Sequence, residues 1–171
     1  MSYYSKLSPR FWTGDTGRAI RGDLEAQVVA TYLVTSPHAN MLGYYYLPIA
    51  YISTDTGIPI EGASKALQRL CDEQYCRYDK ASEVVWIIEM ARIQIGDSLE
   101  KKDKRVIAVA KEYASLPNNL LLQEFFNSYG VAYHMQVRRG FEAPSKPVAV
   151  TVAATTAVAV TAAPAEKPSP W

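Results

Sequence analysis

The feature that most constrains the fold is the stretch over residues 47–90, where two short helical patterns are followed by two strand-like segments. The helical patterns meet at Thr56-Gly57, where glycine supplies the backbone freedom that ends a helix. The strand-like segments flank a short polar tip, which is typical of a hairpin. Helix, tight turn, helix and hairpin in this order predict a winged helix-turn-helix, a unit that usually presents its second helix to a DNA major groove and its hairpin to the flanking backbone.

Each element of this unit has its own local signal. Pro48 fits the first turn of the first helix, and a second helix is expected from Pro59 to Glu73 because its apolar residues recur at helical spacing. That spacing turns Ala63, Ala66, Leu67 and Leu70 inward and Glu61, Ser64, Lys65, Gln68, Arg69 and Asp72 outward. The hairpin is expected to pair residues 75–78 with residues 84–88 around a tip at 79–82.

Further elements are expected on both sides of this unit. A helix should begin after Asp23 and stop at Ser36-Pro37, and the aromatic run at 41–47 predicts a short strand. The glycine-containing run at 13–17 is interpreted as a loop that feeds this helix. On the C-terminal side the sequence predicts a short helix or irregular link at 91–95 and helices at 98–115 and 120–129.

The predicted fold class is therefore mainly α with a small β-hairpin (α+β), a winged helix-turn-helix followed by extra helices. We expect a winged-helix DNA-binding domain over residues 1–92, a helical appendage over 93–140 and a disordered tail rich in Ala, Val, Thr and Pro over 141–171. Two alternatives stay open for the tail: a strand completed by a partner at 148–160, and a docking role for Trp171, against a chance terminal aromatic residue.

Charge limits how DNA could be bound. The 171 residues carry a formal net charge of only +1, so a general attraction to polyanions is not built into the chain. Residues 59–73 sum to −1 and the hairpin charges cancel, whereas residues 1–21 and residues 100–111 each sum to +3. If DNA binds, we expect these flanks to hold its backbone.

The candidate DNA contacts combine the outward face of the second helix, the hairpin and the basic N-terminal flank. Glutamine and arginine have the paired hydrogen-bonding geometry that adenine and guanine edges require. The alternative for each of these side chains is an ordinary solvated surface. The set consists of Ser64, Lys65, Gln68 and Arg69 on the helix, Arg77 and Lys80 in the hairpin, and Arg18 and Arg21 in the flank.

No catalytic pattern emerges, because the sequence has no phosphate-binding Gly-Lys-Ser/Thr loop, nucleophile elbow or spaced carboxylate cluster. We therefore predict a protein that is not an enzyme and needs no cofactor or metal. Cys71 and Cys76 are interpreted as reduced, packed thiols, with a disulfide as the less favoured alternative. Tyr44, Tyr45 and Tyr46 are expected to pack in the sheet rather than stack on bases. No apolar leader or membrane segment is evident, so the expected location is the cytoplasm.

Several segments resemble a known family. Residues 11–18, 26–33 and 36–45, continued by 61–63, 66–70, 78–79, 83–86 and 89–92, are similar to the winged-helix N-terminal domain of bacteriophage and prophage replication proteins of the replisome-organiser or replication-initiator type. The likeness spans about residues 8–135 and is most specific at 37–45. It implies a phage protein that binds double-stranded DNA in replication initiation in the cytoplasm of a bacterial host cell, with a host or phage replication protein as a further partner.

Other functions stay open. The same fold serves transcriptional regulators, and winged helices also act as protein-protein interaction modules that do not bind DNA. In the second case residues 120–129 and the tail would form the partner surface. A homodimer through the helices at 98–129 is a further alternative.

Overall fold

The computed structural model describes residues 4–138, so the predicted tail from 141 onward and Trp171 lie outside the described residues. The described part is mainly α with a three-stranded antiparallel sheet, which confirms the predicted fold class. In chain order the elements are α1 (Arg10–Thr13), α2 (Asp15–Ala19), α3 (Leu24–Thr35), β1 (Tyr44–Tyr46), α4 (Ile49–Thr56), α5 (Ile60–Asp72), β2 (Cys76–Asp79), β3 (Val84–Ile87), α6 (Met90–Gln94), α7 (Arg105–Ser115) and α8 (Leu120–Tyr129).

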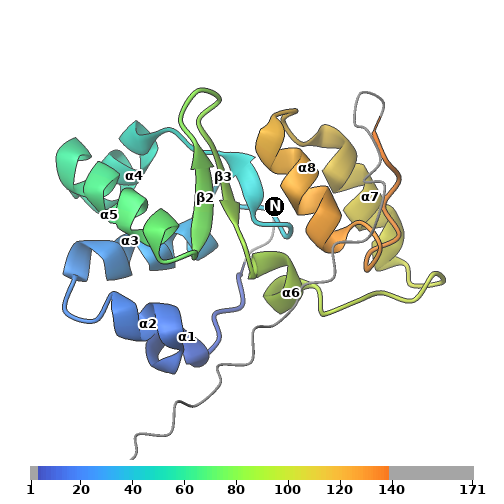
Figure 1. Ribbon diagram of the computed structural model, residues 1–171, viewed down its shortest axis with the longest axis horizontal. Helices are drawn as coiled ribbons and strands as arrows, with labels where there is room; N and C mark the ends of the chain where they lie inside the picture. Colours follow the sequence, from blue (N-terminus) through green and yellow to red (C-terminus); the bar gives the residue numbers. More distant parts are fainter. Residues whose placement is uncertain (1–3, 139–171) are drawn as a thin grey trace, which may run out of the picture.

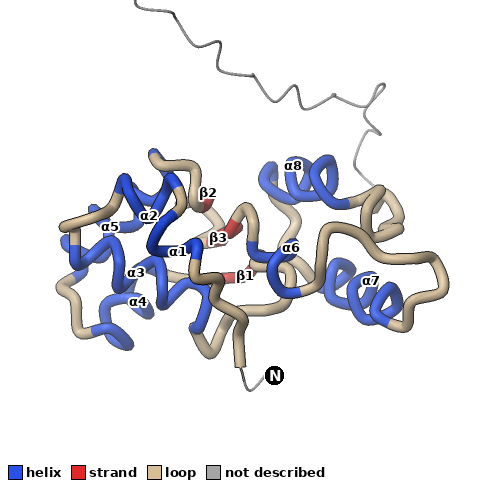
Figure 2. Tube along the Cα trace, turned by 90° about the horizontal axis from the view of Figure 1, so that it is seen from below, coloured by secondary structure: helices blue, strands red, loops and turns tan. Residues whose placement is uncertain are grey.

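The sheet has the strand order β1-β3-β2, so the predicted hairpin gains β1 as a third strand beside β3. Figure 2 shows the strands between two groups of helices, α1 to α5 on one side and α7 and α8 on the other. Successive residues of a strand point to opposite faces, and β3 follows this rule. Val85 and Ile87 enter the core shared with α3 and α5, whereas Val84 and Trp86 enter the core shared with α7 and α8.

The first core joins the helix-turn-helix to the sheet (Figure 1). The buried side of α5 consists of Ala63, Ala66, Leu67 and Leu70, as the helical spacing predicts. Helix α3 packs closely beside α5, since a Cβ added at Gly62 would lie 2.8 Å from the carboxylate oxygens of Glu25. Helix α5 is therefore held closely against α3 and keeps its other side exposed.

The second core places the predicted appendage against the opposite face of the same sheet. Phe125 of α8 makes edge-on contacts with the rings of Tyr44 and Trp86, with centroid distances of 5.8 and 5.9 Å. Tyr113 of α7 also stacks on Phe125. Strand β3 of the hairpin is thus buried on both faces, whereas an isolated wing would leave one face to solvent.

The run at 13–17 was predicted as a loop, and this is wrong, because it ends α1 and forms most of α2. Gly14 takes an extended conformation between the two helices and its N–H donates to the carbonyl of Arg10 at 2.7 Å. A Cβ at Gly17 would lie 2.0 Å from the carbonyl oxygen of Phe11. Glycine therefore permits the close crossing of the two short helices, a tertiary reason that local pattern does not reveal.

The helix predicted over 98–115 begins only at Arg105, so its start is also corrected. The preceding residues make other bonds: the N–H of Leu99 donates to the carbonyl of Ala132 at 2.9 Å. Asp103 accepts the N–H of Arg105 at 2.8 Å, which satisfies a free donor of the helix start. In the hairpin, β2 extends to Asp79 and the tip is shifted by one residue to 80–83.

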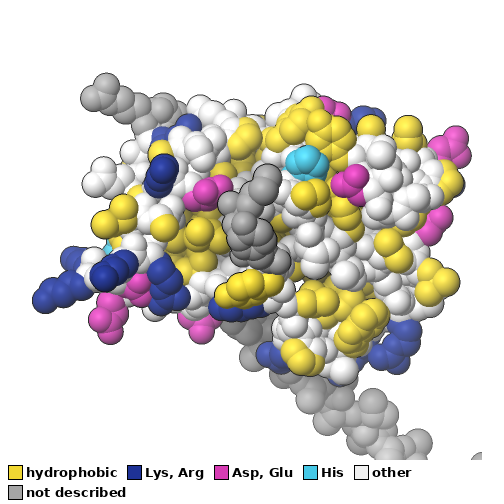
Figure 3. Space-filling view, turned by 180° about the vertical axis from the view of Figure 1, so that it is seen from behind, with side chains coloured by type: hydrophobic (Ala, Val, Ile, Leu, Met, Phe, Trp, Pro, Cys, Tyr) yellow, Lys and Arg dark blue, Asp and Glu magenta, His cyan; other side chains and the backbone are white. Residues whose placement is uncertain are grey.

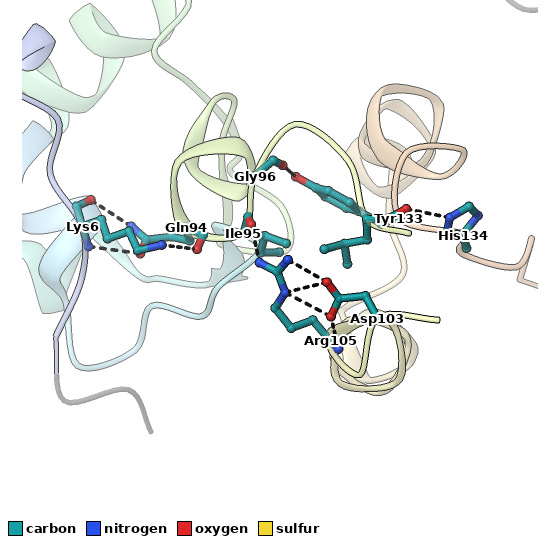
Figure 4. A network of polar contacts seen from close by, with 9 residues as sticks. Lys6, Gln94, Ile95, Gly96, Asp103, Arg105, Tyr133 and His134 are labelled. Atoms are coloured by element: carbon teal, nitrogen blue, oxygen red, sulfur yellow. Dashed lines mark hydrogen bonds and ion pairs between the residues drawn. The ribbon is translucent and has the colours of Figure 1, made fainter. Parts of the chain in front are cut away.

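Polar contacts tie the N-terminal segment and the α6–α7 connection to the body (Figure 4). The side-chain amide of Gln94 accepts the backbone N–H of Lys6 at 3.1 Å and donates to its carbonyl at 2.9 Å. Arg105 donates to the carbonyl of Ile95 at 2.8 Å, and the Tyr133 hydroxyl donates to Gly96 at 2.7 Å. Among residues 4–138, no helix has the length and apolar character needed to cross a membrane.

Candidate nucleic-acid interface

The exposed side of α5 carries four of the predicted contact residues. Gly57, with φ of 76°, ends α4 in the left-handed region, and Pro59 directs the chain into α5. Ser64, Lys65, Gln68 and Arg69 are all exposed along the side of α5 that faces away from the first core. The structure thus brings these four residues onto one solvent-exposed face.

Two of these side chains are already engaged. The guanidinium of Arg69 donates from Nη2 to the carbonyl of Ala19 at 2.9 Å and lies 3.5 Å from the carboxylate of Glu73. Gln68 donates from Nε2 to Asp72 at 2.9 Å. Among the described residues, Lys65 is the basic residue of α5 that has no ion-pair partner. Arg69 therefore acts first as an anchor between helices.

The Arg69 contact also fixes the place of the N-terminal flank. Ala19 is the last residue of α2, so the end of α2 lies directly against α5. Arg18 and Arg21 stand on either side of this contact in sequence and are both exposed. The basic flank that the sequence picked out by charge alone is thus adjacent to the second helix.

Acidic groups border the same face. Glu61 and Asp72 are exposed on α5, and the Glu25 carboxylate lies beside Gly62 near the start of that helix. A carboxylate near a helix N-terminus is favourable for the helix but repels a phosphate. If DNA binds on this face, the attraction would have to come from the side where α2 meets α5.

The hairpin tip is held by α8. Asn119, the N-cap residue of α8, donates from Nδ2 to the Ser82 hydroxyl at 2.8 Å and to Asp79 at 3.2 Å. Its Oδ1 accepts the hydroxyl of buried Tyr44. The Ser82 hydroxyl and nearby backbone amides also lower the pKa of Asp79. The tip therefore has a fixed position relative to the second core.

The two hairpin candidates differ in placement. Lys80 is exposed at the tip, where it can reach a phosphate. Arg77 lies opposite Trp86 in the register, which puts it on the sheet face that carries α8 rather than on the face of α5. The structure does not bring Arg77 together with the exposed side of α5.

The second basic flank lies far from α5. Lys101, Lys102, Lys104 and Lys111 are exposed in or before α7, on the opposite side of the sheet. Figure 3 shows basic side chains gathered at this end of the molecule, with apolar side chains spread over the middle of the same view. A DNA segment that lies on α5 would not also lie on this cluster. Substitutions in the cluster can therefore serve as a control for the effect of net charge.

No family model, curated protein or solved structure matches this chain. Within residues 4–138, no group of three or more His, Cys, Asp and Glu side chains could hold a metal ion.

Tyr44 and Tyr45 are buried in the two cores, so they are not available for base stacking. Tyr46 is exposed, donates to Glu83 at 2.8 Å and has Tyr51 as an edge-on neighbour. His38 stacks on Tyr51 with ring centroids 4.9 Å apart. This aromatic group lies beside an acidic residue, which does not favour a nucleic-acid backbone.

Sequence reasoning missed Asn119 as the residue that holds the hairpin tip. A signal was present, because Asn immediately before an apolar run is a typical N-cap. The signal predicts where α8 starts, but it does not predict that Asn119 also bonds to Tyr44, Asp79 and Ser82.

Proposed function

We propose that this protein binds double-stranded DNA by placing α5 in the major groove, and that it acts in phage-type replication initiation. The observation that carries the DNA-binding part is the contact of α2 with α5 through Arg69 and Ala19. It sets Arg18 and Arg21 beside the exposed side of a helix-turn-helix. The part on replication rests on the resemblance of residues 8–135 to replisome-organiser and initiator proteins.

In this proposal each side chain has a separate role. Lys65, Ser64 and Gln68 face the groove, with Gln68 exchanging its bond to Asp72 for a base edge. Arg18, Arg21 and Lys80 neutralise phosphates, a contribution that is independent of sequence. Arg69 positions α2 on α5, so that its effect on binding is indirect.

The test is fluorescence anisotropy with a labelled duplex from the protein's own gene neighbourhood and a scrambled duplex, over a salt series. Each lost phosphate contact should reduce the slope of log K against log salt by about 0.9. The double variant Arg18→Ala/Arg21→Ala should therefore lower the slope by about 1.8 and weaken binding to both duplexes. Lys65→Ala should weaken binding to the cognate duplex more than to the scrambled one.

The matched control is Lys101→Ala/Lys102→Ala, which removes the same charge on the other side of the sheet. It should leave the salt slope almost unchanged. Equal losses in the two double variants would show that binding follows net charge rather than the proposed face. Absence of binding at low salt would refute the DNA-binding proposal outright.

The second candidate function is a protein-interaction module, and the exposed apolar residues of α3 support it. Leu24 and Val28 are 74% and 46% exposed, and Trp12 of α1 is 56% exposed beside them around a shared surface hollow. The opposite side of α3 is buried in the first core, so this helix is apolar on both sides. In contrast, the apolar side of α8 is buried in the second core. The double variant Leu24→Gln/Val28→Gln should abolish self-association or partner binding if α3 is an interaction surface. That result, together with no DNA binding by the wild-type protein, would favour the interaction module over the DNA-binding function.

A further inference from the structure

The two cysteines of the chain meet where α5 ends and β2 begins. Cys71 lies in the last turn of α5 and Cys76 is the first residue of β2, with their Sγ atoms 3.7 Å apart. Both are free thiols in the structure, and the full sequence contains no other cysteine. Any thiol chemistry of this protein is therefore chemistry of this pair.

A defined helix ending brings them together. The N–H of Tyr75 donates to the carbonyl of Leu70 at 2.9 Å, and the N–H of Gln74 donates to Cys71 at 3.1 Å. These bonds, with Gln74 at φ of 57°, form a Schellman motif, which reverses the chain at the end of a helix. The reversal returns Cys76 to the side of Cys71, so the contact is a consequence of the backbone path.

The two thiols are not equivalent. Cys76 is completely buried in the first core, whereas Cys71 is partly exposed at its edge. The two thiols are within hydrogen-bonding distance of each other, and either one can donate. The contact with Cys76 lowers the pKa of Cys71, and a backbone bond with Tyr78 acts in the same direction. The same contact, together with burial, raises the pKa of Cys76. The accessible sulfur is thus the one more readily present as a thiolate, the nucleophilic form.

We propose that Cys71 and Cys76 are an oxidative modification site, in which Cys71 reacts with a peroxide and Cys76 then closes an intramolecular disulfide. The site takes small hydroperoxides, since Cys71 is only partly exposed. This inference is independent of DNA binding.

The chemistry balances with hydrogen peroxide as the oxidant. The Cys71 thiolate attacks one peroxide oxygen, the O–O bond breaks, and hydroxide leaves and takes up a proton, giving Cys71 sulfenic acid and water. The Cys76 sulfur, on losing its proton, attacks the sulfenic sulfur, and the S–O bond breaks to release a second water. Two thiols are oxidised by two electrons in total, and one peroxide is reduced to two waters.

The step needs only a small movement. The sulfur atoms must approach from 3.7 Å to about 2.05 Å, the length of a disulfide bond. Cys71 lies in the last turn of α5 at the edge of the first core, where it is only partly buried. The product would fasten the end of α5 to β2.

The experiment treats the reduced full-length protein with one equivalent of hydrogen peroxide and measures intact mass, free thiols and oligomeric state. We expect a monomer that has lost two hydrogen atoms and both free thiols, and that regains them with a dithiol reductant. A covalent dimer, a product that gains two oxygens without a disulfide, or unchanged thiols would each overturn the proposal.

Two variants separate the roles. In Cys76→Ala, Cys71 should form a sulfenic acid that dimedone traps. In Cys71→Ala, the buried Cys76 should react with peroxide at least about tenfold more slowly than wild type. Circular dichroism checks that both variants are folded. Equal reactivity of the two single-cysteine variants would overturn the assignment, and the wild-type mass decides the case if either variant fails to fold.

Discussion

Replacing Asn119 by Ala tests the link between the hairpin tip and α8 most directly. The Asn119 side chain accepts the N–H of Leu122 at 3.3 Å as the N-cap of α8. It also accepts the hydroxyl of Tyr44 and donates to Ser82. One truncation therefore removes a helix cap, leaves a buried phenol without its main acceptor and frees the tip.

The magnitude follows from these contacts. Loss of an N-cap costs about 1 kcal/mol. A buried hydroxyl that loses its partner costs about 1–3 kcal/mol. Tyr44 keeps a weak second acceptor, the carbonyl of Pro117 at 3.4 Å, which favours the lower half of that range. We expect Asn119→Ala to lower the free energy of unfolding by about 2–3 kcal/mol.

The assay is urea unfolding followed by circular dichroism, with hydrogen exchange of β2 and β3 amides as a local readout. Asn119→Ser is the matched control, because serine keeps a capping oxygen but is too short to reach the hairpin. Its free energy of unfolding should fall by about 1–2 kcal/mol. In both variants the amides at the hairpin tip should exchange faster than in the wild-type protein. A loss below about 0.5 kcal/mol for Asn119→Ala would refute the claim that this network stabilises the protein.

Two further predictions concern the helix ending and alkaline pH. Gln74→Gly should raise the free energy of unfolding, measured in urea, by about 0.5–1 kcal/mol, because glycine adopts the observed φ of 57° without steric cost. A lower free energy of unfolding in this variant would contradict the assignment of a Schellman motif. Burial, as the first cause, raises the pKa of Tyr32, Tyr78 and Tyr133 from 10.0 to about 12. The unfolded chain therefore loses these protons first, so their contribution to stability is complete below pH 10 and declines as the pH rises towards 12. Urea midpoints that stay constant up to pH 11.5, with tyrosinate absorbance appearing before unfolding, would contradict this.

Local pattern predicted the elements whose signals are contained in a few residues. The inward side of α5 and the break at Gly57 follow from helical spacing and glycine freedom. The pairing of β1 with β3 joins residues that are far apart in sequence, and the crossing of α1 and α2 depends on a close backbone approach that helical or strand spacing does not reveal. Gly17 illustrates the limit: its role is set by the carbonyl of Phe11 on the preceding helix, and its sequence context reads as a loop.

For the candidate interface, charge counting predicted the N-terminal flank but could not distinguish it from the equally basic stretch at 100–111. The structure separates them, since only the first meets α5. Arg69 shows what composition cannot reveal: the sequence predicts a DNA contact for this arginine, and in the structure its guanidinium also donates to the carbonyl of Ala19.

These contacts restrict how DNA could approach. A sheet whose central strand is buried on both faces, with its tip held by Asn119, cannot let the hairpin swing into a groove independently of α8. In the proposed complex Lys80 would therefore meet the DNA backbone in the position it already has, while Arg18 and Arg21 would meet it next to the contact of α2 with α5. A duplex on this face would be held at both edges by phosphate contacts, with only Lys65, Ser64 and Gln68 between them to read bases. Binding of this kind should be strongly salt-dependent and only modestly sequence-selective, because base readout rests on few side chains.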